Sequence, residues 1–310
     1  MKKLLSLVLA LCMVLGCTSA LAADKYEIGI LQLVQHEALD AATKGFMDAL
    51  TEKLGADNVE FDLQNASGDT AACNTIATTF DANAVDLIMA NATPALLAAS
   101  NASIAIPVLG TSVTDYSDAF AGEIPSNVSG TSDLAPLDAQ AAMIKELFPE
   151  AKKVGLLFCS AEPNSVFQVN AITVYLKELG YETEEFAFAD SNDVASVAQS
   201  AADNCDVIYI PTDNTAASYA ETIANVLIPA NIPAVVGESG ICKGCGVATL
   251  SISYYDLGWQ TGLMAYDILV NGADIANMDI CYAPNPVKLY NADICAQLGL
   301  TMPADYQPIQ

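Results

Sequence analysis

The sequence contains no arginine and a single histidine, His36, among its 310 residues. Its 11 basic residues are therefore all lysine, against 37 Asp and Glu, and the formal net charge is -26. Nucleic acids bind to a cationic protein face, so this charge excludes them as partners, and it disfavours anionic membrane surfaces for the same reason. One histidine also excludes a histidine-based metal site, and a Ser–His–Asp triad would have to use His36.

The common motifs of enzymes are missing as well. The chain has no G-x-x-x-x-G-K loop, no G-x-G-x-x-G and no G-x-S-x-G. Carboxylates are plentiful, but no pair is set apart by its spacing, so no carboxylate-based active site is marked. We therefore expect a protein that is not an enzyme and that carries no metal or cofactor.

The composition indicates a folded protein with a large core. Hydrophobic residues make up 53% of the chain and charged residues 15%, a composition unlike that of disordered chains. With about 150 residues per domain, a chain of this length holds two domains.

Residues 1–23 have the pattern of a signal peptide. Two lysines precede an apolar run, Leu4 to Gly16, that is shorter than the roughly 20 residues of a membrane span. Two forms of processing fit this leader. Ala20-Leu21-Ala22 favours cleavage near residue 23, whereas Val14-Leu15-Gly16-Cys17 resembles a bacterial lipobox and would leave Cys17 lipidated. Both predict an exported protein, periplasmic or held at the cell surface.

Seven cysteines follow the leader, an odd number that is a poor basis for a disulfide framework. Several lie in apolar runs, as Cys159 does, which is typical of buried free thiols. Cys242-Lys243-Gly244-Cys245 has the spacing of a redox pair or of half a metal site. No second pair and no nearby histidine completes a metal site, so we expect plain thiols or a local disulfide there.

Strands and helices alternate along the whole chain. The predicted strands are short apolar runs at Tyr26–Leu33, Asn58–Asp62, Asp86–Ala90, Ser103–Leu109, Lys153–Cys159, Glu182–Phe188, Asp206–Ile210, Ile232–Val236 and Ala248–Ile252. Helical patterns lie between them, and this alternation predicts parallel sheets built from βαβ units. It occurs as two similar blocks, roughly 26–130 and 150–240, and the turn-rich segment Gly122–Asp138 between them predicts a crossing from one lobe to the other.

Polar loops follow the predicted strands, at the edge where open parallel sheets bind ligands. The candidate binding residues in these loops are Gln32, His36, Ala92, Thr93, Thr114 and Asp115 in the first block, and Ser160, Glu162, Asn164, Ser165, Phe167, Thr212, Asp213, Asn214 and Glu238 in the second. Backbone N–H groups at helix starts suit a carboxylate and the acidic side chains suit an ammonium, so a cleft with both suits a zwitterion. In the alternative interpretation these side chains only cap helices and turns, His36 included.

Several of these stretches resemble a known family. Ile28-Gly29-Ile30-Leu31-Gln32, followed by His36-Glu37-Ala38-Leu39-Asp40, resembles the opening of exported substrate-binding proteins of ABC transporters, in the family that includes the TrpX-like tryptophan- and aromatic-amino-acid-binding proteins. Further matches are Asn91–Ala95, Ser160–Ser165, Pro211–Thr215 and Tyr254–Gly258. The first loop departs from the family, because members often carry Glu-His-Pro where this chain has Gln35-His36-Glu37.

The resemblance implies the fold of periplasmic binding proteins of type I, an α/β fold of two doubly wound parallel-sheet lobes joined by a three-strand hinge. It assigns residues 24–130 and 250–273 to lobe I and residues 131–249 and 274–310 to lobe II, with the ligand between the lobes. It also implies an amino acid as ligand, aromatic or large and apolar, an ABC permease as membrane partner, and a monomer.

Loop position and resemblance together assign roles to the candidate residues. We expect Thr93 and neighbouring backbone amides to bind the carboxylate of the ligand, and Asp213, with Glu162 or Glu238, to bind its amino group. The side-chain pocket is expected to be shaped by Gln32, His36 and Phe167. A sugar or a nucleoside is the alternative ligand, although the loops are short of the aromatic rings that stack on sugars, and a ligand-sensing receptor without transport is the alternative role.

Overall fold

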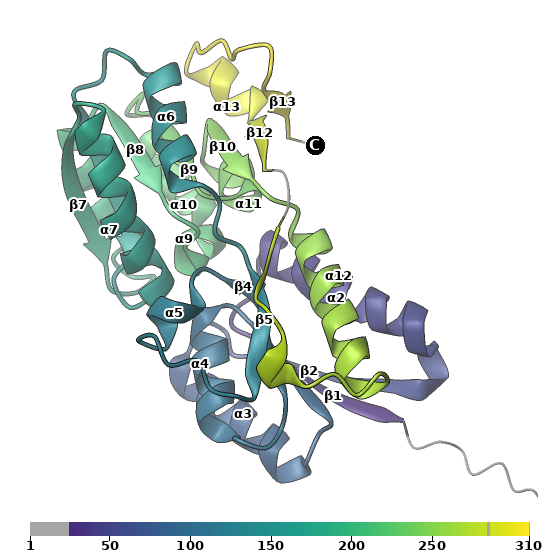
Figure 1. Ribbon diagram of the computed structural model, residues 1–310. Coiled ribbons are helices and arrows are strands. Elements are labelled where there is room, and N and C mark those ends of the chain that lie inside the picture. Colours follow the sequence, from purple (N-terminus) through teal and green to yellow (C-terminus); the bar gives the residue numbers. More distant parts are fainter. Residues whose placement is uncertain (1–24, 284–285, 310) are drawn as a thin grey trace, which may run out of the picture.

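The computed structural model describes residues 25–283 and 286–309, so the predicted signal peptide and Cys17 lie outside the described residues. The chain forms two α/β lobes, lobe I in the lower half of Figure 1 and lobe II in the upper half. Each lobe is a mostly parallel sheet with apolar cores on both of its faces. The predicted fold class, periplasmic binding protein type I, is confirmed.

Lobe I is built on six strands in the order β11-β5-β4-β3-β1-β2, all parallel. Its strands are β1 (Tyr26–Gln32), β2 (Val59–Asn65), β3 (Leu87–Asn91), β4 (Val108–Val113), β5 (Val128–Ser132) and β11 (Cys281–Tyr282). Its helices are α2 (Glu37–Leu54) and α12 (Tyr254–Leu269) on one face, α3 (Thr70–Asn83) and α4 (Thr93–Ala102) on the other, and the short η1 (Ala56–Asn58), α5 (Tyr116–Ala119) and η2 (Ile275–Asn277).

Lobe II is built on seven strands in the order β13-β12-β10-β9-β8-β6-β7, and only the pair β10–β12 is antiparallel. Its strands are β6 (Lys153–Cys159), β7 (Glu182–Phe188), β8 (Val207–Ile210), β9 (Ala234–Val236), β10 (Ala248–Ser251), β12 (Val287–Tyr290) and β13 (Gln307–Pro308). Its helices are α6 (Leu137–Leu147), α7 (Pro163–Glu178) and α13 (Ala292–Gln297) on one face, and α8 (Val194–Asn204), α9 (Asn214–Ser218), α10 (Ala220–Leu227) and α11 (Ser239–Gly244) on the other.

The two sheets repeat one strand order, β2-β1-β3-β4-β5 in lobe I and β7-β6-β8-β9-β10 in lobe II. In each sheet, successive strands are first added toward one edge and then toward the other. This reversal falls between β1 and β3 in lobe I and between β6 and β8 in lobe II. Ligands bind in doubly wound sheets at this switch point, outside the carboxyl ends of the strands. The loops there begin at Leu33, Ala92, Ser160 and Pro211, so the fold brings four predicted binding loops to the two facing ends of the lobes.

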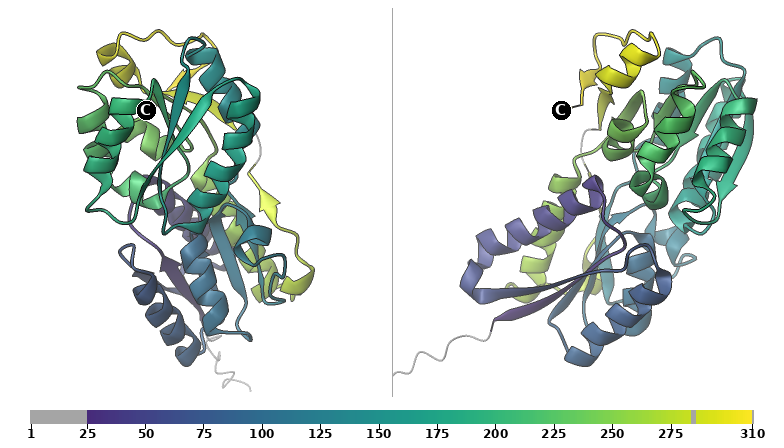
Figure 2. Two further views of the ribbon diagram at one scale, coloured as in Figure 1. Left: turned by 90° about the vertical axis from the view of Figure 1, so that its left-hand side faces the viewer. Right: turned by 180° about the vertical axis from the view of Figure 1, so that it is seen from behind.

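Three crossings join the lobes: between β5 and α6, between β10 and α12, and between β11 and β12. Figures 1 and 2 show the two lobes arranged end to end, with the first two connecting segments running between them. The third crossing falls later in the chain than the division at residue 274 that the resemblance implied. Cys281 and Tyr282 pair with Thr131 and Ser132 of the first sheet, and Ile275, Met278 and Cys281 pack against the apolar core of lobe I, which holds this segment on that lobe.

Strand β5 lies inside the segment that the sequence suggested was only a turn-rich crossing. Its sequence, VSGTS, is small and polar, yet all five residues are buried. Gly130 has φ +145, and a Cβ there would overlap Gly110 O of β4. Gly110 and Gly130 face each other and therefore let β5 approach β4 closely. The amino-acid composition of the segment does not reveal this strand pairing.

Helices α2 and α12 also pack through glycine, because a Cβ on Gly258 would overlap the carbonyl oxygen of Ala42. Gly258→Ala must therefore push the helices apart, and we expect the free energy of unfolding to fall by about 1–3 kcal/mol in urea denaturation. Gln260→Ala, an exposed change on the same helix, is the control and should stay within about 0.5 kcal/mol of the parent. Equal losses in both variants would contradict this packing.

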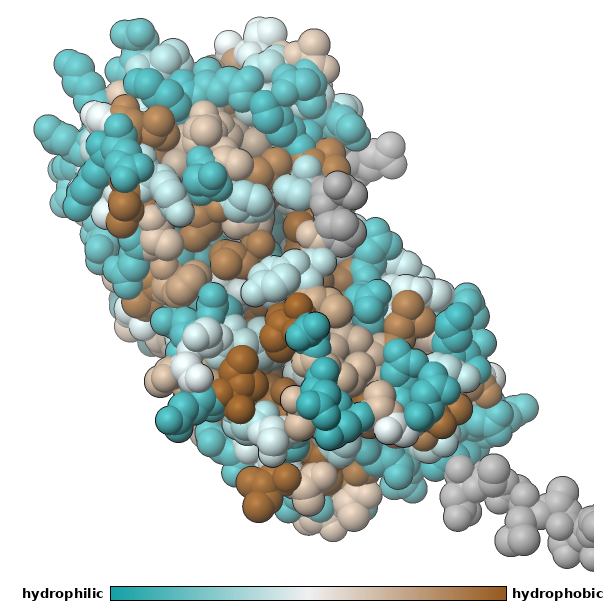
Figure 3. All heavy atoms as spheres, in the orientation of Figure 1, coloured by the Kyte–Doolittle hydropathy of each residue, from teal (hydrophilic) through white to brown (hydrophobic). Residues whose placement is uncertain are grey.

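The surface agrees with the acidic composition. Figure 3 shows hydrophilic residues over most of the visible face of both lobes, with hydrophobic residues scattered among them. Exposed large apolar side chains include Ile104 and Tyr282. Among the described residues, no helix combines the length and the hydrophobicity that crossing a membrane requires.

Candidate ligand-binding cleft

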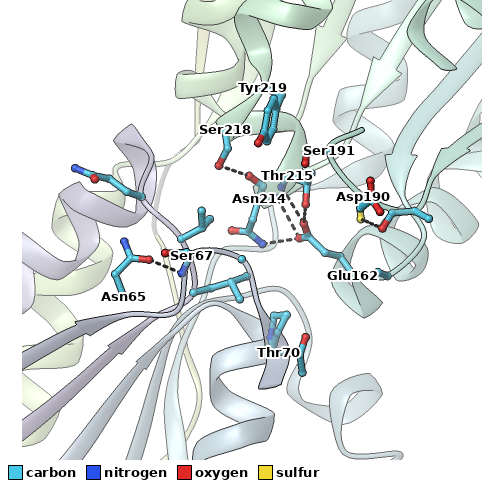
Figure 4. A pocket seen from close by; sticks show the side chains of 18 residues that line it. Asn65, Ser67, Thr70, Glu162, Asp190, Ser191, Asn214, Thr215, Ser218 and Tyr219 are labelled. Carbon is cyan, nitrogen blue, oxygen red and sulfur yellow. Dashed lines mark hydrogen bonds between the residues drawn. The ribbon is translucent and has the colours of Figure 1, made fainter. Parts of the chain in front are cut away.

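The cleft between the lobes contains three hollows, and we call two of them the inner and the outer cavity. The inner cavity holds only about 10 Å³; it is lined by His36, Leu39, Ser112, Thr114, Asp133, Asn164, Thr212, Asp213, Asn214, Ala217, Glu238 and Tyr254. The outer cavity, of about 530 Å³, lies between lobe I, with Leu33–Gln35, Asn65, Ser67, Gly68 and Thr70, and lobe II, with Glu162, Asp190, Asn214, Thr215, Ser218 and Tyr219, among others. The third hollow, of about 410 Å³, lies between Gln35, His36 and Glu37 of lobe I and residues of lobe II that include Ala217, Ser218 and Lys243. Asn214 lines both the inner and the outer cavity, and Figure 4 shows its side chain at the outer one.

Hydrogen bonds join the lobes across the cleft. His36 Nε2 of lobe I lies 3.2 Å from Asn214 Oδ1 of lobe II, and Gln168 Nε2 of lobe II donates to Thr114 Oγ1 of lobe I at 3.3 Å. At the rim, Lys243 and Glu37 form an ion pair of 3.2 Å. These contacts and the small volume of the inner cavity indicate a closed conformation.

Buried polar atoms without a partner gather around this closed cleft. Among the described residues there are six such atoms, and all but Thr249 Oγ1 belong to predicted loops or their neighbours: His36 Nδ1, Asn91 Oδ1, Thr93 Oγ1, Ser112 Oγ and Asn164 Oδ1. A buried polar group without a hydrogen bond costs about 1–3 kcal/mol, and proteins rarely leave one. A polar ligand that hydrogen-bonds to these atoms would remove that cost.

The two lobes differ in hydrogen-bonding chemistry. At the ends of β3 and β4, lobe I has two unpaired hydroxyls, Thr93 and Ser112, which can donate, beside one unpaired amide oxygen, Asn91 Oδ1, which accepts. Thr93 also begins helix α4, whose first backbone N–H groups are free to bind an anion. Ala92 and Ser112 have φ of +91 and +54, and such strained backbone is concentrated at binding sites. This edge of lobe I is therefore suited to a carboxylate.

Lobe II and the hinge face the inner cavity with carboxylates. Asp133, Asp213 and Glu238 are buried there, and no lysine lines the inner or the outer cavity. Burial raises the pKa of Asp133 to about 6 and that of Glu238 to about 7. Burial, and then the charge of Glu162, raises the pKa of Asp213 as well. Carboxyl groups in this state favour a cationic ligand group, which would restore their ionised form.

Some of the residues that line the cavities also cap helices and turns, as the alternative interpretation predicted. Asp213 accepts hydrogen bonds from the backbone N–H groups of Cys159 (2.6 Å) and Ala216 (2.7 Å). Glu162 accepts from the N–H groups of Asn214 (3.0 Å) and Thr215 (2.8 Å), as Figure 4 shows. Both carboxylates therefore hold the loops after β6 and β8 together. His36 makes no capping hydrogen bond to helix α2.

Seven predicted residues line neither cavity: Gln32, Ala92, Thr93, Asp115, Ser160, Ser165 and Phe167. The Gln32 side chain is used inside lobe I, where it accepts from Thr43 and donates to Asp40. Ser160 is exposed and donates to the carbonyl of Phe188. The Asp115 carboxylate caps helix α5, and the half-buried Phe167 lines neither cavity.

Thr212, Ser165 and Ala92 border the cleft. Thr212 lines the inner cavity and its hydroxyl accepts from Gln168 at 2.5 Å, and Ser165 is buried next to Asn164, from which it accepts at 3.3 Å. Ala92 contributes backbone where α4 begins.

Sequence reasoning missed three polar residues of the inner cavity: Ser112, Asp133 and Tyr254. Asp133 lies in the first crossing and Tyr254 directly after the second, and the Tyr254 hydroxyl donates to Asp133 at 2.9 Å. The carboxylate also accepts from Thr114 at 3.3 Å. Asp133 could have been found from the sequence, because it is an acidic residue inside the predicted crossing Gly122–Asp138. A segment that crosses between the lobes must pass the base of the cleft between them.

The thiols form no binding site in the described structure. The seven cysteines of the described ranges are free, and Cys242 and Cys245 are buried thiols whose pKa is raised by burial. No cluster of three or more His, Cys, Asp or Glu within the described ranges is arranged to hold a metal ion.

Two doubly wound lobes, three crossings and a polar cleft closed between them define a two-lobed solute-binding protein. The chain belongs to the family described as ABC transporter substrate binding protein, whose model matches residues 27–306. It is 33% identical to a "Tyrosine-binding protein" of Clostridioides difficile (strain R20291), over 96% of this chain and 93% of that relative.

Two solved structures bear on the conformation. A domain from Streptococcus pneumonia in complex with L-Trp is 32% identical, has a TM-score of 0.88, and covers 92% of this chain and 100% of that one. A ligand-free, open substrate binding protein with adhesive properties from Clostridium difficile is 35% identical, with coverage of 92% and 99%, but has a TM-score of only 0.69. The lobes are therefore placed more as in the complex than as in the open protein.

Proposed function

We propose that this protein is the exported receptor of an ABC importer and captures a free amino acid with an aromatic or large apolar side chain. The observation that carries the proposal is the division of chemistry across the cleft. Lobe I offers unpaired hydroxyl and N–H donors beside the acceptors His36 Nδ1 and Asn91 Oδ1, whereas the carboxylates that face the inner cavity all lie on lobe II and the hinge. A zwitterion satisfies both sides at once, whereas a neutral sugar brings no charge to the carboxylates.

Each end of the amino acid has a proposed partner. The carboxylate of the ligand binds the Thr93 and Ser112 hydroxyls and the N-terminus of α4. The ammonium binds Asp213, together with Glu238 and the unpaired Oδ1 of Asn164, because these acceptors line the inner cavity. The side chain extends toward the outer cavity, where apolar residues such as Leu33 and Tyr219 lie. The names of the tyrosine-binding relative and of the L-Trp complex support this class of ligand.

Closure of the lobes is the proposed mechanism of delivery. A ligand that contacts both lobes shifts the population from an open to a closed form, since its binding energy differs between the two. The contacts from His36 to Asn214 and from Gln168 to Thr114 form only when the lobes meet. The closed monomer would then be recognised by an ABC permease. Export would be directed by the leader, which either is removed near residue 23 or is cleaved before Cys17 and leaves that residue as the lipid anchor. The protein needs no cofactor and performs no chemistry in this role.

A thermal-shift panel tests the proposal. L-Tyrosine, L-tryptophan, L-phenylalanine and L-leucine are compared with glucose, myo-inositol and adenosine. A ligand at about 100 times its dissociation constant adds about 2.7 kcal/mol to the free energy of unfolding, so at least one amino acid should raise the melting temperature clearly. Stabilisation by a sugar or a nucleoside alone, or by nothing in the panel, would contradict the proposal.

A further inference from the structure

His36 has one ring nitrogen engaged and one unpaired. It lies in the loop between β1 and α2, and its Nε2 is 3.2 Å from Asn214 Oδ1 on the opposite lobe. Its Nδ1 is buried and has no partner. The ring lines the inner cavity, and the preceding residues, Leu33–Gln35, line the outer one. His36 therefore lies between the inner cavity and the third hollow of the cleft, next in the chain to Gln35 in the wall of the outer cavity.

The neighbours of His36 determine which nitrogen carries the proton. Asn214 Nδ2 donates to Glu162 Oε2 at 2.6 Å, and a carboxylate can only accept, so the amide nitrogen of Asn214 faces Glu162 and its oxygen faces His36. An amide oxygen also only accepts, so the hydrogen of that bond is on Nε2. In a neutral imidazole the other nitrogen, Nδ1, is then a lone-pair acceptor.

The ring is neutral at neutral pH. Burial lowers the pKa of His36, and this effect exceeds the opposite effects of the Asn214 hydrogen bond and of the charges of Glu162 and Asp40. The side chain of Asp40 is directed to Gln32, from which it accepts at 2.7 Å. Nδ1 therefore remains an acceptor under ordinary conditions.

The charged ends of an amino acid do not use this acceptor. An ammonium has three N–H groups, and Asp213, Glu238 and Asn164 Oδ1 offer it more acceptors than that, two of them ionisable carboxyl groups. The carboxylate of the ligand has no hydrogen to donate. A donor for His36 Nδ1 must therefore come from the ligand's side chain.

We infer that His36 Nδ1 accepts a hydrogen bond from the ligand's side chain, and that the site selects large apolar side chains with one N–H or O–H donor, a phenol or an indole, over phenylalanine. The inference rests on the proposed amino-acid function and specifies its ligand further. Asn214 and Glu162 are positioning residues in this arrangement, because they fix the proton on Nε2. A ligand without the donor leaves a buried nitrogen unpaired, which is how binding sites reject analogues that lack one hydrogen-bonding group.

Calorimetric titration of the full mature chain with matched ligands tests the inference. The five ligands are L-tyrosine, L-tryptophan and three analogues that each lack one donor: L-phenylalanine and O-methyl-L-tyrosine lack the phenol O–H, and 1-methyl-L-tryptophan lacks the indole N–H. We expect the dissociation constant to rise about tenfold or more when the donor is removed. If all five ligands bind equally, the inference is wrong and the proposed function stands; if no amino acid binds, the proposed function itself is wrong.

Two variants separate the nitrogen atoms. In His36→Asn the side-chain oxygen is bonded to Cγ, as Nδ1 is, so an acceptor is retained; in His36→Gln the polar atoms lie one bond further out, near Nε2. We expect His36→Asn to keep most of the preference for tyrosine over phenylalanine and His36→Gln to bring the ratio close to one. A preference that survives in His36→Gln would overturn the inference. Melting temperatures without ligand establish that both variants fold.

Nitrogen NMR of the wild-type protein needs no variant. Because His36 is the only histidine, labelling with ¹⁵N-histidine gives one pair of ring signals. We expect Nε2 to be protonated and Nδ1 to be unprotonated, and the Nδ1 signal to move upfield with tyrosine but not with phenylalanine. A proton on Nδ1 in the tyrosine complex would overturn the inference.

Discussion

Asp213→Asn should weaken the binding of an amino acid by roughly 30- to 150-fold. The Asp213 carboxylate lines the inner cavity and is almost fully buried, and we propose that it pairs with the ammonium of the ligand. A hydrogen bond to a charged group contributes about 2–3 kcal/mol, which sets the expected change in dissociation constant. Isothermal titration calorimetry with the best ligand of the thermal-shift panel measures it.

Asp115→Asn is the matched control. Asp115 also caps a helix with its carboxylate, accepting from Asp118 N at 2.8 Å as Asp213 accepts from Ala216 N at 2.7 Å, but it lines neither cavity. We expect the control to bind within about twofold of the parent. Unchanged affinity in Asp213→Asn would refute the ammonium assignment. Asn caps helices about as well as Asp, and both melting temperatures must be recorded because each carboxylate also accepts backbone hydrogen bonds.

The unliganded protein should be closed more often at pH 5 than at pH 8. Closing the cleft removes water from carboxyl groups, and burial in the closed form raises the pKa of Glu238 to about 7 and that of Asp133 to about 6. For Glu238 the difference from its ordinary value of 4.5 corresponds to about 3 kcal/mol. Small-angle scattering should therefore give a smaller radius of gyration at pH 5 without ligand.

The sign follows from proton counting. Between about pH 4 and 7 the closed form binds more protons on its carboxyl groups than an open form in which water reaches them, so closing becomes less favourable as the pH rises through this range and changes little above it. His36 acts in the opposite direction: its pKa is lowered by burial, so its protonation below about pH 6.5 opposes closure. Three carboxyl groups line the cavity against one imidazole, and their effect dominates.

A cationic ligand group should remove this pH dependence. With an ammonium beside the carboxylates, the protein should be compact at pH 8 as well as at pH 5. Glu238→Gln is the variant to compare, because it cannot ionise and should reduce the pH response of the unliganded protein. A radius of gyration that is the same at both pH values without ligand would contradict the prediction.

Local sequence was sufficient for strands β6 and β7, which match the predicted strands Lys153–Cys159 and Glu182–Phe188. Strand β6 is apolar after Lys153, as a covered parallel strand requires. Strand β7 lies at the edge of the sheet, so it carries three glutamates before the apolar run Phe186–Phe188. Local sequence was insufficient for β5, whose small polar residues are buried by contact with β4. The strand predicted from the sequence also begins too early for β4, at Ser103 instead of Val108, since the segment between these residues is a loop.

For the cleft, sequence position indicated the loops but not the direction of each side chain. Gln32 is the last residue of β1, and its side chain turns into lobe I to bond Thr43, whereas His36 reaches the other lobe. Successive strand residues face opposite sides of a sheet, so a shift of one position moves a side chain out of the site. Asp133 escaped prediction because its neighbours in the cavity come from distant parts of the chain.

The sequence by itself determined the alternation of strands and helices, the loops that end each strand and the charge that excludes nucleic acid, because these depend on neighbouring residues and on composition. The tertiary structure alone decided which polar atoms meet. His36 and Asn214 are 178 residues apart, and Tyr254 and Asp133 are 121 apart. The first pair forms only when two independently wound lobes close on each other, and the second only when the end of β5 meets the start of α12 in the folded hinge. Both depend on the summed packing of the lobes and the hinge, not on any local pattern.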